Sequence, residues 1–554
     1  MANLPVRGLG SQGIITDVNP HDLPPNAFSD GSNVVFRDGA VIRAPVFKDL
    51  ASVAGGSSYL SDAQEDDIAG IFNYSTSLSG AIIGVVGNDN RVYTYDNGIE
   101  ADVTPPGATT TVSDGVYTSC EIAGFAILNR STSEPYIFEP VAHTTFKKMS
   151  DGDWPAADRA VAMRAYKDFI LALNVTASGI KYGTMVKWSD AVQYKTNYTT
   201  GITWTPATSN LAGSNILTDF RTDIVDGLPL GNAFIIYSTT ESAIMDFTGS
   251  QSVFAFRNFY QGDGVINVNC VVSTGKEHFV FGDTDIYMHN GITVRQLARG
   301  KVKERVYSTL VRDKQDKCFV HYDQVNDLIY FCYPSAENGV GFVNTEYCNR
   351  AAVYDLKSQT WSFVDLPNAA GAAYTNISLA NNTYAGVTSS YLANANKYSQ
   401  YEDTSPRVSA FVGAEDNANG LTDTRIYAND MLVSGLMSGA SNLETLKPAF
   451  VERIGLDVDE ANVPLRSYKQ CKAMIPQITT LGGTDDIVIK LGSTNLPFDD
   501  APNYTTTLTF QPDVNHKVDS KAAGRLLAYR VEENNGNFFD FSAADFEVEI
   551  TSER

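Results

Sequence analysis

The sequence predicts a mainly β protein, an irregular β-propeller of about six blades followed by a C-terminal β-sandwich. Three observations support this prediction. The 554 residues include 28 Tyr and 28 Phe, which favour strands, and only 19% are charged, which is low for a helical protein. Short apolar segments, each followed by a turn and a more polar segment, recur through the middle of the chain. The length exceeds one ordinary core, so we expect two or more domains.

The recurring unit has a spacing close to 44 residues. The middles of the apolar segments serve as anchors, and these are Ile83, Ile127, Leu171, Ile236, Val280 and Tyr330. Successive anchors are 44, 44, 65, 44 and 50 residues apart, and repeats of roughly 40–50 residues with several strands each are typical of propeller blades. An insertion between Tyr182 and about Asp226 explains the long interval. We expect residues 56–404 to form six blades, or five or seven, with the anchored strands innermost.

One hairpin indicates how a blade is built. Residues 352–364, AVYDLKSQTWSFV, alternate, turn at Lys-Ser-Gln and alternate again. Val353, Trp361 and Phe363 are large enough to cover one face of a hairpin, yet a lone hairpin is barely stable in water. We therefore expect this hairpin to be the outer half of a blade, packed against its neighbours.

Three regions lie outside the repeat. Residues 1–55 contain NVVFRDGAVIRAPVF, in which Asp38-Gly39 is a strong hairpin signal, and form a predicted N-terminal hairpin or platform. Residues 405–446 are rich in Gly, Asn, Ser and Ala with little periodicity, which predicts a loop-rich excursion serving as a tip or an intersubunit contact. Residues 447–554 return to alternation in DDIVIKLG, TTTLTF, LLAYRVE and FEVEIT, which predicts the β-sandwich.

The net charge of −23 argues against a protein that binds nucleic acid by neutralising phosphates. It suits a protein that stays soluble at high concentration, or one that must not adhere to a polyanion. Residues 1–50 carry −1, residues 447–554 carry −6, and the middle carries the remaining −16. One segment, residues 299–317, has seven bases against three acids and includes the one clear helix signal, Lys301–Asp313. A solvated helix face is the preferred interpretation, with a contact to DNA or an acidic partner as the alternative.

The six cysteines are too sparse for a disulfide scaffold. The N-terminal residues have no apolar signal core, and no run approaches 18 apolar residues. We therefore expect a chain made in a cytoplasm, without an export signal or a membrane span.

Few residues suggest chemistry. Cys318 and His321 lie three apart, with Cys332 and Cys348 downstream, but strand positions alternate faces and no CxxC pair exists, so buried thiols are favoured over zinc. No GxSxG, HExxH, Walker-loop or EF-hand pattern is present.

Two further turns resemble sites only weakly. Asp151–Trp154, DGDW, is more typical of a surface turn than of a calcium loop. Ser189-Asp190 resembles a sialidase Asp-box, but it occurs once and lacks the following Gly. We expect no catalytic residue, no metal and no cofactor, and so no enzymatic activity.

Three segments together resemble the nozzle, or tail tubular, proteins of short-tailed bacteriophages, also described as packaged-DNA-stabilisation proteins. They span the chain in the order that the family shows. The segments are GIITDVNPHDLPPNAFSDGSNVVFRDGAVIRAP near the N-terminus, WSDAVQYKTNYTTGITWTPATSNLAG from Trp188, and FQPDVNHKVDSKAAGRLLAYRVEENN from Phe510.

The resemblance implies a structural protein of the virion tail, assembled in the host cytoplasm. It implies a homohexamer below the portal and the tail adaptor protein, with tail fibre or spike proteins at its periphery. Genomic DNA would pass through the lumen without tight binding, retained until ejection. An acidic surface facing DNA is consistent with such passage, because both carry the same sign.

Within residues 405–446, four apolar side chains are candidates for a channel gate when six copies converge: Met431, Leu432, Leu436 and Met437. The alternative, which we favour, is that they pack on a neighbouring subunit. Two other functions stay open for the whole chain. One is a propeller enzyme of the virion that degrades glycans, and the other is a cytoplasmic propeller that binds proteins.

Overall fold

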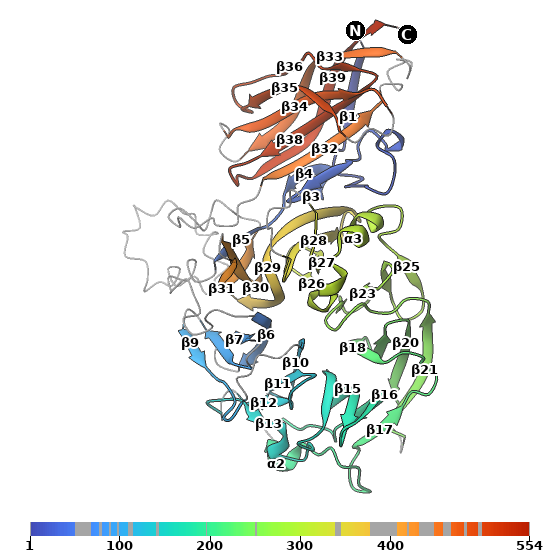
Figure 1. The fold of residues 1–554 in the computed structure, drawn as a ribbon, viewed down its shortest axis with the longest axis vertical. Helices are drawn as coiled ribbons and strands as arrows, with labels where there is room; N and C mark the ends of the chain where they lie inside the picture. Colours follow the sequence, from blue (N-terminus) through green and yellow to red (C-terminus); the bar gives the residue numbers. More distant parts are fainter. Residues whose placement is uncertain are drawn as a thin grey trace.

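The computed structural model describes most of the chain. The described residues are 2–49, 68–76, 80–87, 90–96, 99–108, 115–139, 143–194, 197–249, 252–337, 345–376, 407–417, 420–430, 448–457, 467–480, 485–496 and 501–552. They are mainly β (Figure 1), arranged as a ring of small sheets below and a pair of larger sheets above, with both termini at the top.

Five blades of the ring are four-stranded antiparallel sheets whose strands follow sequence order. Blade 1 has β6 (Ile68–Thr76), β7 (Gly80–Gly87), β8 (Val92–Asp96) and β9 (Ile99–Asp102); blade 2 has β10 (Tyr117–Ile122), β11 (Phe125–Arg130), β12 (Tyr136–Phe138) and β13 (Lys147–Lys148). Blade 3 has β14 (Arg159–Tyr166), β15 (Phe169–Ala177), β16 (Ile180–Trp188) and β17 (Gly213–Ile216); blade 4 has β18 (Ile224–Leu230), β19 (Ala233–Ser238), β20 (Glu241–Phe247) and β21 (Phe254–Gln261). Blade 5 has β22 (Val271–Ser273), β23 (His278–Phe281), β24 (Ile286–His289) and β25 (Val294–Gln296).

Blade 6 belongs to a seven-stranded sheet. Its strands in spatial order are β26 (Phe319–Asp323), β27 (Leu328–Tyr333), β28 (Cys348–Asp355), β29 (Trp361–Asn376), β30 (Arg407–Asn417), β31 (Gly420–Asp430) and β5 (Val46–Asp49). The ring closes where β29 and β30 contact β6 of blade 1. The sheet of the last blade thus includes β5, a strand that precedes the first blade in sequence.

Six blades are confirmed, but the predicted position of the anchors was wrong by one strand. All six anchors lie on the second strand of their blades, from β7 to β27, and not on the innermost. The first strands contact one another around the axis. First strands such as YTSCEI in β10 mix polar with apolar residues because one end lines the axis. Second strands lie between neighbouring blades, so both of their faces are apolar and they dominate the sequence pattern.

The hairpin of residues 352–364 forms the third and fourth strands of blade 6, as predicted. The side chain of Trp361 is buried, with its ring centroid 5.1 Å from that of Tyr354 and 5.7 Å from that of Phe331. Its Nε1 donates a hydrogen bond of 3.1 Å to the Leu297 carbonyl oxygen, just beyond β25. Trp361 therefore packs at the seam between blades 5 and 6.

The prediction of a loop-rich excursion over residues 405–446 needs correction. Residues 407–417 and 420–430 form the hairpin β30–β31, which pairs with β29 on one side and β5 on the other. Phe411 lies within ring-contact distance of Phe47, Phe319 and Tyr330, at 5.1 to 6.4 Å between centroids. The sequence shows little period-2 alternation because Ala410, Phe411 and Val412 are all buried.

The upper part contains two antiparallel sheets. One has the order β3-β4-β39-β33-β36, with β1 also on β39 and β37 also on β33; the other has the order β2-β32-β38-β34-β35. Tyr529 on β38 and Phe546 on β39 meet with ring centroids 5.2 Å apart, within one core shared by the two sheets. The strands are β1 (Ala2–Arg7), β2 (Asp30–Ser32), β3 (Val34–Arg37), β4 (Ala40–Arg43), β32 (Ala449–Leu456), β33 (Tyr468–Thr480), β34 (Ile487–Thr494), β35 (Asn503–Phe510), β36 (Val518–Asp519), β37 (Ala523–Gly524), β38 (Leu526–Glu533) and β39 (Phe539–Ser552).

The predicted Asp38-Gly39 hairpin forms between β3 and β4, and both turn residues have positive φ, 51° and 79°. The segment of residues 1–55 does not stand alone. Four of its strands join the two C-terminal sheets and the fifth, β5, joins the sheet of blade 6. The first strand, β1, finds its pairing partner near the other end of the chain, as in the pairing of Ala2 with Val548.

The helices of the described residues are short. They are η1 (Pro20–Asp22), η2 (Met149–Asp151), α2 (Tyr198–Gly201), α3 (Lys303–Thr309) and η3 (Arg312–Lys317). The predicted helix over Lys301–Asp313 is shorter in the structure because Leu310 adopts an extended conformation that ends α3. Within the described residues, no helix has the length and apolar character needed to cross a membrane.

Candidate functional site

The axis of the propeller is a narrow, partly filled space. Two adjoining cavities of about 180 and 270 Å³ lie along it, and Ser119, Val320 and Ala372 belong to the walls of both. Cavities of this size hold water or a small molecule. A nucleic-acid duplex, whose major groove alone is about 12 Å wide, does not fit.

A buried ion pair beside this axis joins adjacent blades. Arg164 on β14 donates from Nε and Nη2 to the two carboxylate oxygens of Asp226 on β18, at 2.8 and 2.7 Å. Nη2 also donates to Oδ1 of Asn269 at 2.8 Å, and Nη1 donates to the carbonyl oxygen of Ser119 at 3.2 Å. The guanidinium therefore contacts blades 2 and 4 and the segment that leads into blade 5.

The position of Asp226 favours the protonated, charged form of Arg164. Burial by itself would lower the pKa of Arg164, but the carboxylate of Asp226 raises it above its ordinary value. Asn269 extends the network, because its Nδ2 donates to the Tyr117 carbonyl oxygen at 2.8 Å and its backbone N donates to Asp226 at 2.9 Å. We call this network the axial clamp, because its groups bind one another across adjacent blades and so stabilise the ring.

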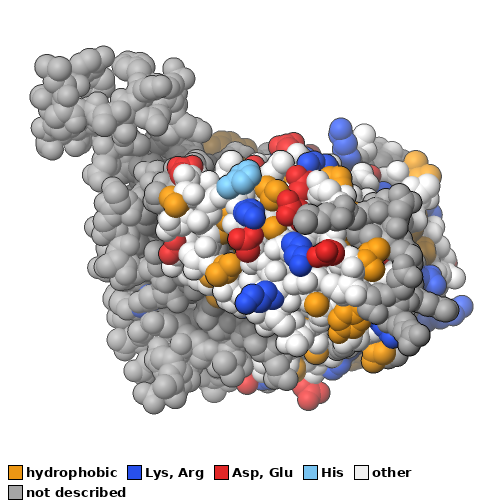
Figure 2. Space-filling model, turned by 90° about the horizontal axis from the view of Figure 1, so that it is seen from above, with side chains coloured by type: hydrophobic (Ala, Val, Ile, Leu, Met, Phe, Trp, Pro, Cys, Tyr) orange, Lys and Arg blue, Asp and Glu red, His pale blue; other side chains and the backbone are white. Residues whose placement is uncertain are grey.

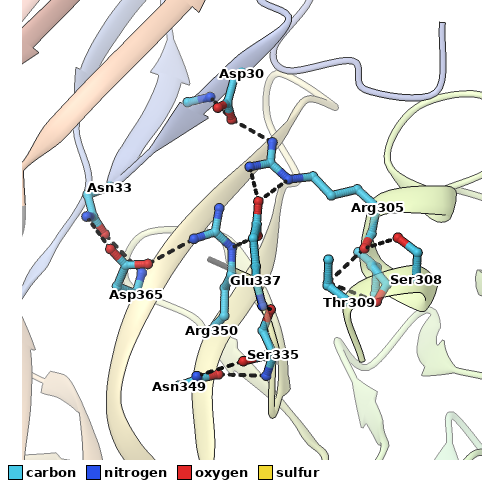
Figure 3. Close-up of polar contacts among 12 residues, drawn as sticks. Asp30, Asn33, Arg305, Ser308, Thr309, Ser335, Glu337, Asn349, Arg350 and Asp365 are labelled. Carbon is cyan, nitrogen blue, oxygen red and sulfur yellow. Dashed lines mark hydrogen bonds and ion pairs between the residues drawn. The ribbon is translucent and has the colours of Figure 1, made fainter. Parts of the chain in front are cut away.

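A second polar network lies where the ring meets the C-terminal sheets (Figure 3). Arg305 on α3 donates to Asp30 on β2 at 2.6 Å and to Glu337 at 2.6 Å. On the far side of Glu337, Arg350 on β28 lies 3.2 Å from its carboxylate and donates to Asp365 on β29 at 3.0 Å. Two arginines therefore alternate with three carboxylates across the junction.

Asn33 completes this junction network. Its Nδ2 donates to the Asp365 carboxylate at 2.9 Å, and its Oδ1 accepts from the Asp365 backbone N at 2.9 Å. The same Nδ2 reaches the carbonyl oxygen of Pro448 at 3.0 Å, at the start of the C-terminal sheets. Asn33 has φ of 59°, a left-handed conformation that Asn tolerates better than most residues. The network thus binds the N-terminal strands and the start of the C-terminal sheets to blade 6.

The ring of Phe363 lies among these charges. The guanidinium carbons of Arg305 and Arg350 are 4.6 and 5.0 Å from its centroid. Burial would lower the pKa of Arg305, but Asp30 and Glu337 raise it well above its ordinary value. Both guanidinium groups thus lie between carboxylates and an aromatic face, an arrangement suited to rigid attachment.

The candidate gate residues Met431, Leu432, Leu436 and Met437 lie outside the described residues. They directly follow β31, which ends at Asp430.

The cysteines that suggested a metal site are buried thiols. Cys270, Cys318, Cys332 and Cys348 lie near one another around blades 5 and 6, without disulfides. Cys348 Sγ contacts the Lys317 carbonyl oxygen at 3.2 Å. In the part of the chain that the structure describes, no group of three or more His, Cys, Asp or Glu side chains is placed to hold a metal ion.

The basic segment of residues 299–317 is neutralised locally. Besides Arg305, four of its bases form ion pairs: Lys303 with Asp285, Arg312 with Asp283, Lys314 with Glu346 and Lys317 with Asp316. Its apolar positions Val302, Val306 and Leu310 are buried. These pairs favour the interpretation of a docked helix over a phosphate-binding patch.

The two weaker candidate turns have structural roles. Asp153 accepts hydrogen bonds from the backbone N of Trp204 and of Thr205, both at 2.7 Å, so it anchors the insertion of blade 3. Ser189 accepts from the Ile170 backbone N at 3.0 Å, and Asp190 accepts from the Leu211 backbone N at 2.9 Å.

The end of the molecule that carries the C-terminal sheets shows no single charge sign. In Figure 2, acidic, basic and apolar side chains are interspersed over its described surface. The excess of acids in the chain is therefore not gathered on the described part of this face.

The six blades define this chain as a β-propeller protein. No protein-family model matches it, and no curated protein matches it. Among solved structures, it is similar to a chain of "Crystal Structure of Mitotic Checkpoint Complex", with a TM-score of 0.36 and 10% identity, over 69% of this chain and 93% of that chain. This likeness carries no argument about function.

Proposed function

We propose that this protein is a structural component of a bacteriophage tail, six copies of which form a nozzle below the portal and adaptor. In that role it retains packaged DNA and conducts it at ejection, and it has no catalytic activity. The observation that carries the proposal is the set of three nozzle-like segments, which span the chain in order and coincide with a propeller joined to C-terminal sheets.

The axial cavities bear on how DNA would pass. Because they are too small for a duplex, the lumen in this proposal lies between subunits and not through a propeller. With −23 per chain, six copies bring about 138 excess negative charges to the assembly. Where such charge faces the lumen it repels DNA over about 8–10 Å at physiological salt.

Rigidity supports the same role. The axial clamp fixes the blades to one another, and the junction network fixes the C-terminal sheets to blade 6. A subunit with two such fixed parts suits a ring that must withstand the pressure of packaged DNA. The segment after β31, with Met431, Leu432, Leu436 and Met437, remains our candidate for a gate or for an intersubunit contact.

Deleting Asp430–Ser441 in the virus separates these two roles. A gate variant assembles tails that leak DNA, whereas a variant that has lost a subunit contact fails to assemble tails. Tails that assemble and retain DNA normally would remove this segment from both roles. A variant in which only Met431 and Met437 are replaced by Ser tests the same segment with a smaller change than the deletion.

The runner-up is a propeller enzyme of the virion that degrades host glycans. A sugar-releasing assay on host envelope polysaccharide tests it directly. Turnover that one carboxylate substitution abolishes would replace the structural proposal. The third function, a propeller that binds cytoplasmic proteins, predicts a chain that is absent from purified virus particles.

A further inference from the structure

A chain of three neutral side chains joins blade 4 to blade 5. The hydroxyl of Tyr237 on β19 lies 2.7 Å from Nδ1 of His278 on β23 and 2.6 Å from Nε2 of His289 on β24. All three side chains are buried, with at most 1% of each residue exposed. This cluster belongs neither to the axial clamp nor to the junction network.

The outer contacts fix the position of each proton. Nε2 of His278 lies 3.0 Å from the Pro229 carbonyl oxygen, which only accepts, so Nε2 carries the proton and Nδ1 accepts from Tyr237. The backbone N of Gly291 donates to Nδ1 of His289 at 3.2 Å, so that nitrogen has no proton. Nε2–H of His289 then donates to the Tyr237 oxygen. Every contact is satisfied when both imidazoles are neutral.

A second proton on either imidazole disrupts this arrangement of donors and acceptors. On His278 it binds Nδ1, so the Tyr237 oxygen faces two N–H donors and its own proton loses its acceptor. On His289 it binds Nδ1, where two N–H donors then face each other. Burial lowers the pKa of His278 to about 4 and that of His289 to about 3, the latter also through the charge of His278.

Among the described residues, no carboxylate acts on the charge of His278 or His289. The groups that act on Tyr237 are Tyr287 on β24 and Asp226 on β18. Asp226 is already bound by Arg164 in the axial clamp. Phe259 on β21 covers His289 with ring centroids 5.0 Å apart.

We propose that the hydrogen-bonded chain of His289, Tyr237 and His278 is an acid-sensitive latch between blades 4 and 5. The latch is closed while both imidazoles are neutral, and it opens when they take up protons. Two turns with exposed residues flank it, Thr274–Glu277 before β23 and Asn290–Thr293 after β24. Solvent therefore reaches the latch through a local opening of the seam.

Hydrogen exchange of the full-length protein, read by mass spectrometry between pH 7 and 4.5 and corrected for intrinsic rates, tests the latch. We expect the opening equilibrium of β19, β23 and β24 to rise as pH falls, approaching about 100-fold per pH unit because two protons are taken up. Blades 1 and 2 should not share this steep rise. Equal pH dependence in all blades would overturn the proposal.

Substitutions of the two histidines test which side chains take up the protons. His289→Gln keeps an N–H donor near Nε2, and His278→Asn keeps an acceptor near Nδ1, but neither new side chain titrates. Each variant should reduce the dependence to about 10-fold per pH unit, and the double variant should abolish it. His516→Gln, at an exposed position, is the matched control and should behave as wild type.

Nitrogen-15 spectra of the wild-type imidazoles at pH 7 provide a readout that does not depend on the variants folding. The latch requires the Nε2–H tautomer at both His278 and His289. An Nδ1–H tautomer at either residue would contradict it.

Discussion

Arg164 on β14 and Asp226 on β18 are 62 residues apart in sequence and meet through two parallel hydrogen bonds of 2.8 and 2.7 Å beside the propeller axis. Both side chains are buried, with 10% and 0% of their surfaces exposed. Planar pairing of this kind fixes orientation as well as distance. The pair therefore sets the angle between blades 3 and 4.

We expect Arg164→Ala to lower the free energy of unfolding by about 3–5 kcal/mol, because it leaves the Asp226 carboxylate buried and unpaired. Urea denaturation measures the loss. The matched control is Arg257→Ala, which removes a pair with Asp246 that is 59% and 43% exposed and should cost less than about 1 kcal/mol. Equal losses in the two variants would mean that the axial clamp does not hold the ring.

Trp361→Ala should cost about 3–5 kcal/mol, because the indole is buried at the seam between blades 5 and 6 and its N–H is bonded to the Leu297 carbonyl oxygen. Trp361→Phe keeps the ring contacts and should cost clearly less. Denaturant melts of both variants check this order. A loss below about 1 kcal/mol for the alanine variant would contradict the packing described for the seam.

Stability should fall in acid partly through His321 on β26. Burial lowers its pKa to about 3, and its Nε2 lies 2.9 Å from Oγ of Ser409 on β30. The unfolded chain binds the proton near pH 6.5 and the folded chain does not, so this contribution is complete above pH 6.5 and is lost as pH falls toward 3. We expect His321→Asn to remove about 1.5 kcal/mol of the loss between pH 6.5 and 5, measured by urea melts. An unchanged pH dependence would contradict the assignment.

The junction network predicts a localised effect of Arg305→Ala. The change leaves Asp30 and Glu337 without their shared cation, so the C-terminal sheets should loosen from blade 6 while the blades stay intact. Limited proteolysis should then cut between the propeller and residue 448 faster than in wild type. Arg312→Ala, which removes an exposed pair on the same segment, serves as the control.

Thiol labelling tests the buried cysteines. Burial raises the pKa of Cys120 and of Cys471 to about 12, and it also raises that of Cys318, so the nucleophilic thiolate is scarce at neutral pH. The native protein should react slowly with a thiol reagent, and all six thiols should react after unfolding. Rapid reaction of Cys318 in native protein would show that the seam between blades 5 and 6 is open.

The blade repeat could be predicted from sequence because one strand in each blade is covered on both faces. That signal identified the second strands, such as β19 with FIIY, and not the innermost ones. Innermost strands carry residues such as Ser119 and Arg164 toward the axis, which weakens the apolar pattern. The hairpin β30–β31 was not predicted for a related reason. Phe411 and its neighbours are all buried, so the segment lacks the alternation that is typical of a strand, and the other strands of its sheet lie elsewhere in the chain.

The polar networks could not be predicted because their members are far apart in sequence. Asn33 and Asp365 are separated by 332 residues, and nothing local to either residue indicates the other. The pairing of β1 with β39 is of the same kind. The local sequence pattern indicates that a segment is a strand, whereas the strand with which it pairs depends on the fold of the whole chain.

We propose that six copies of this chain form part of a virus tail. The most direct test is antibody labelling, together with a copy-number measurement, on purified virus particles whose genome encodes the chain. We expect label at the tail and six copies per particle, a ring of about 360 kDa built from chains of 60.1 kDa. Particles that lack the chain, or that carry it in a number other than six, would contradict it.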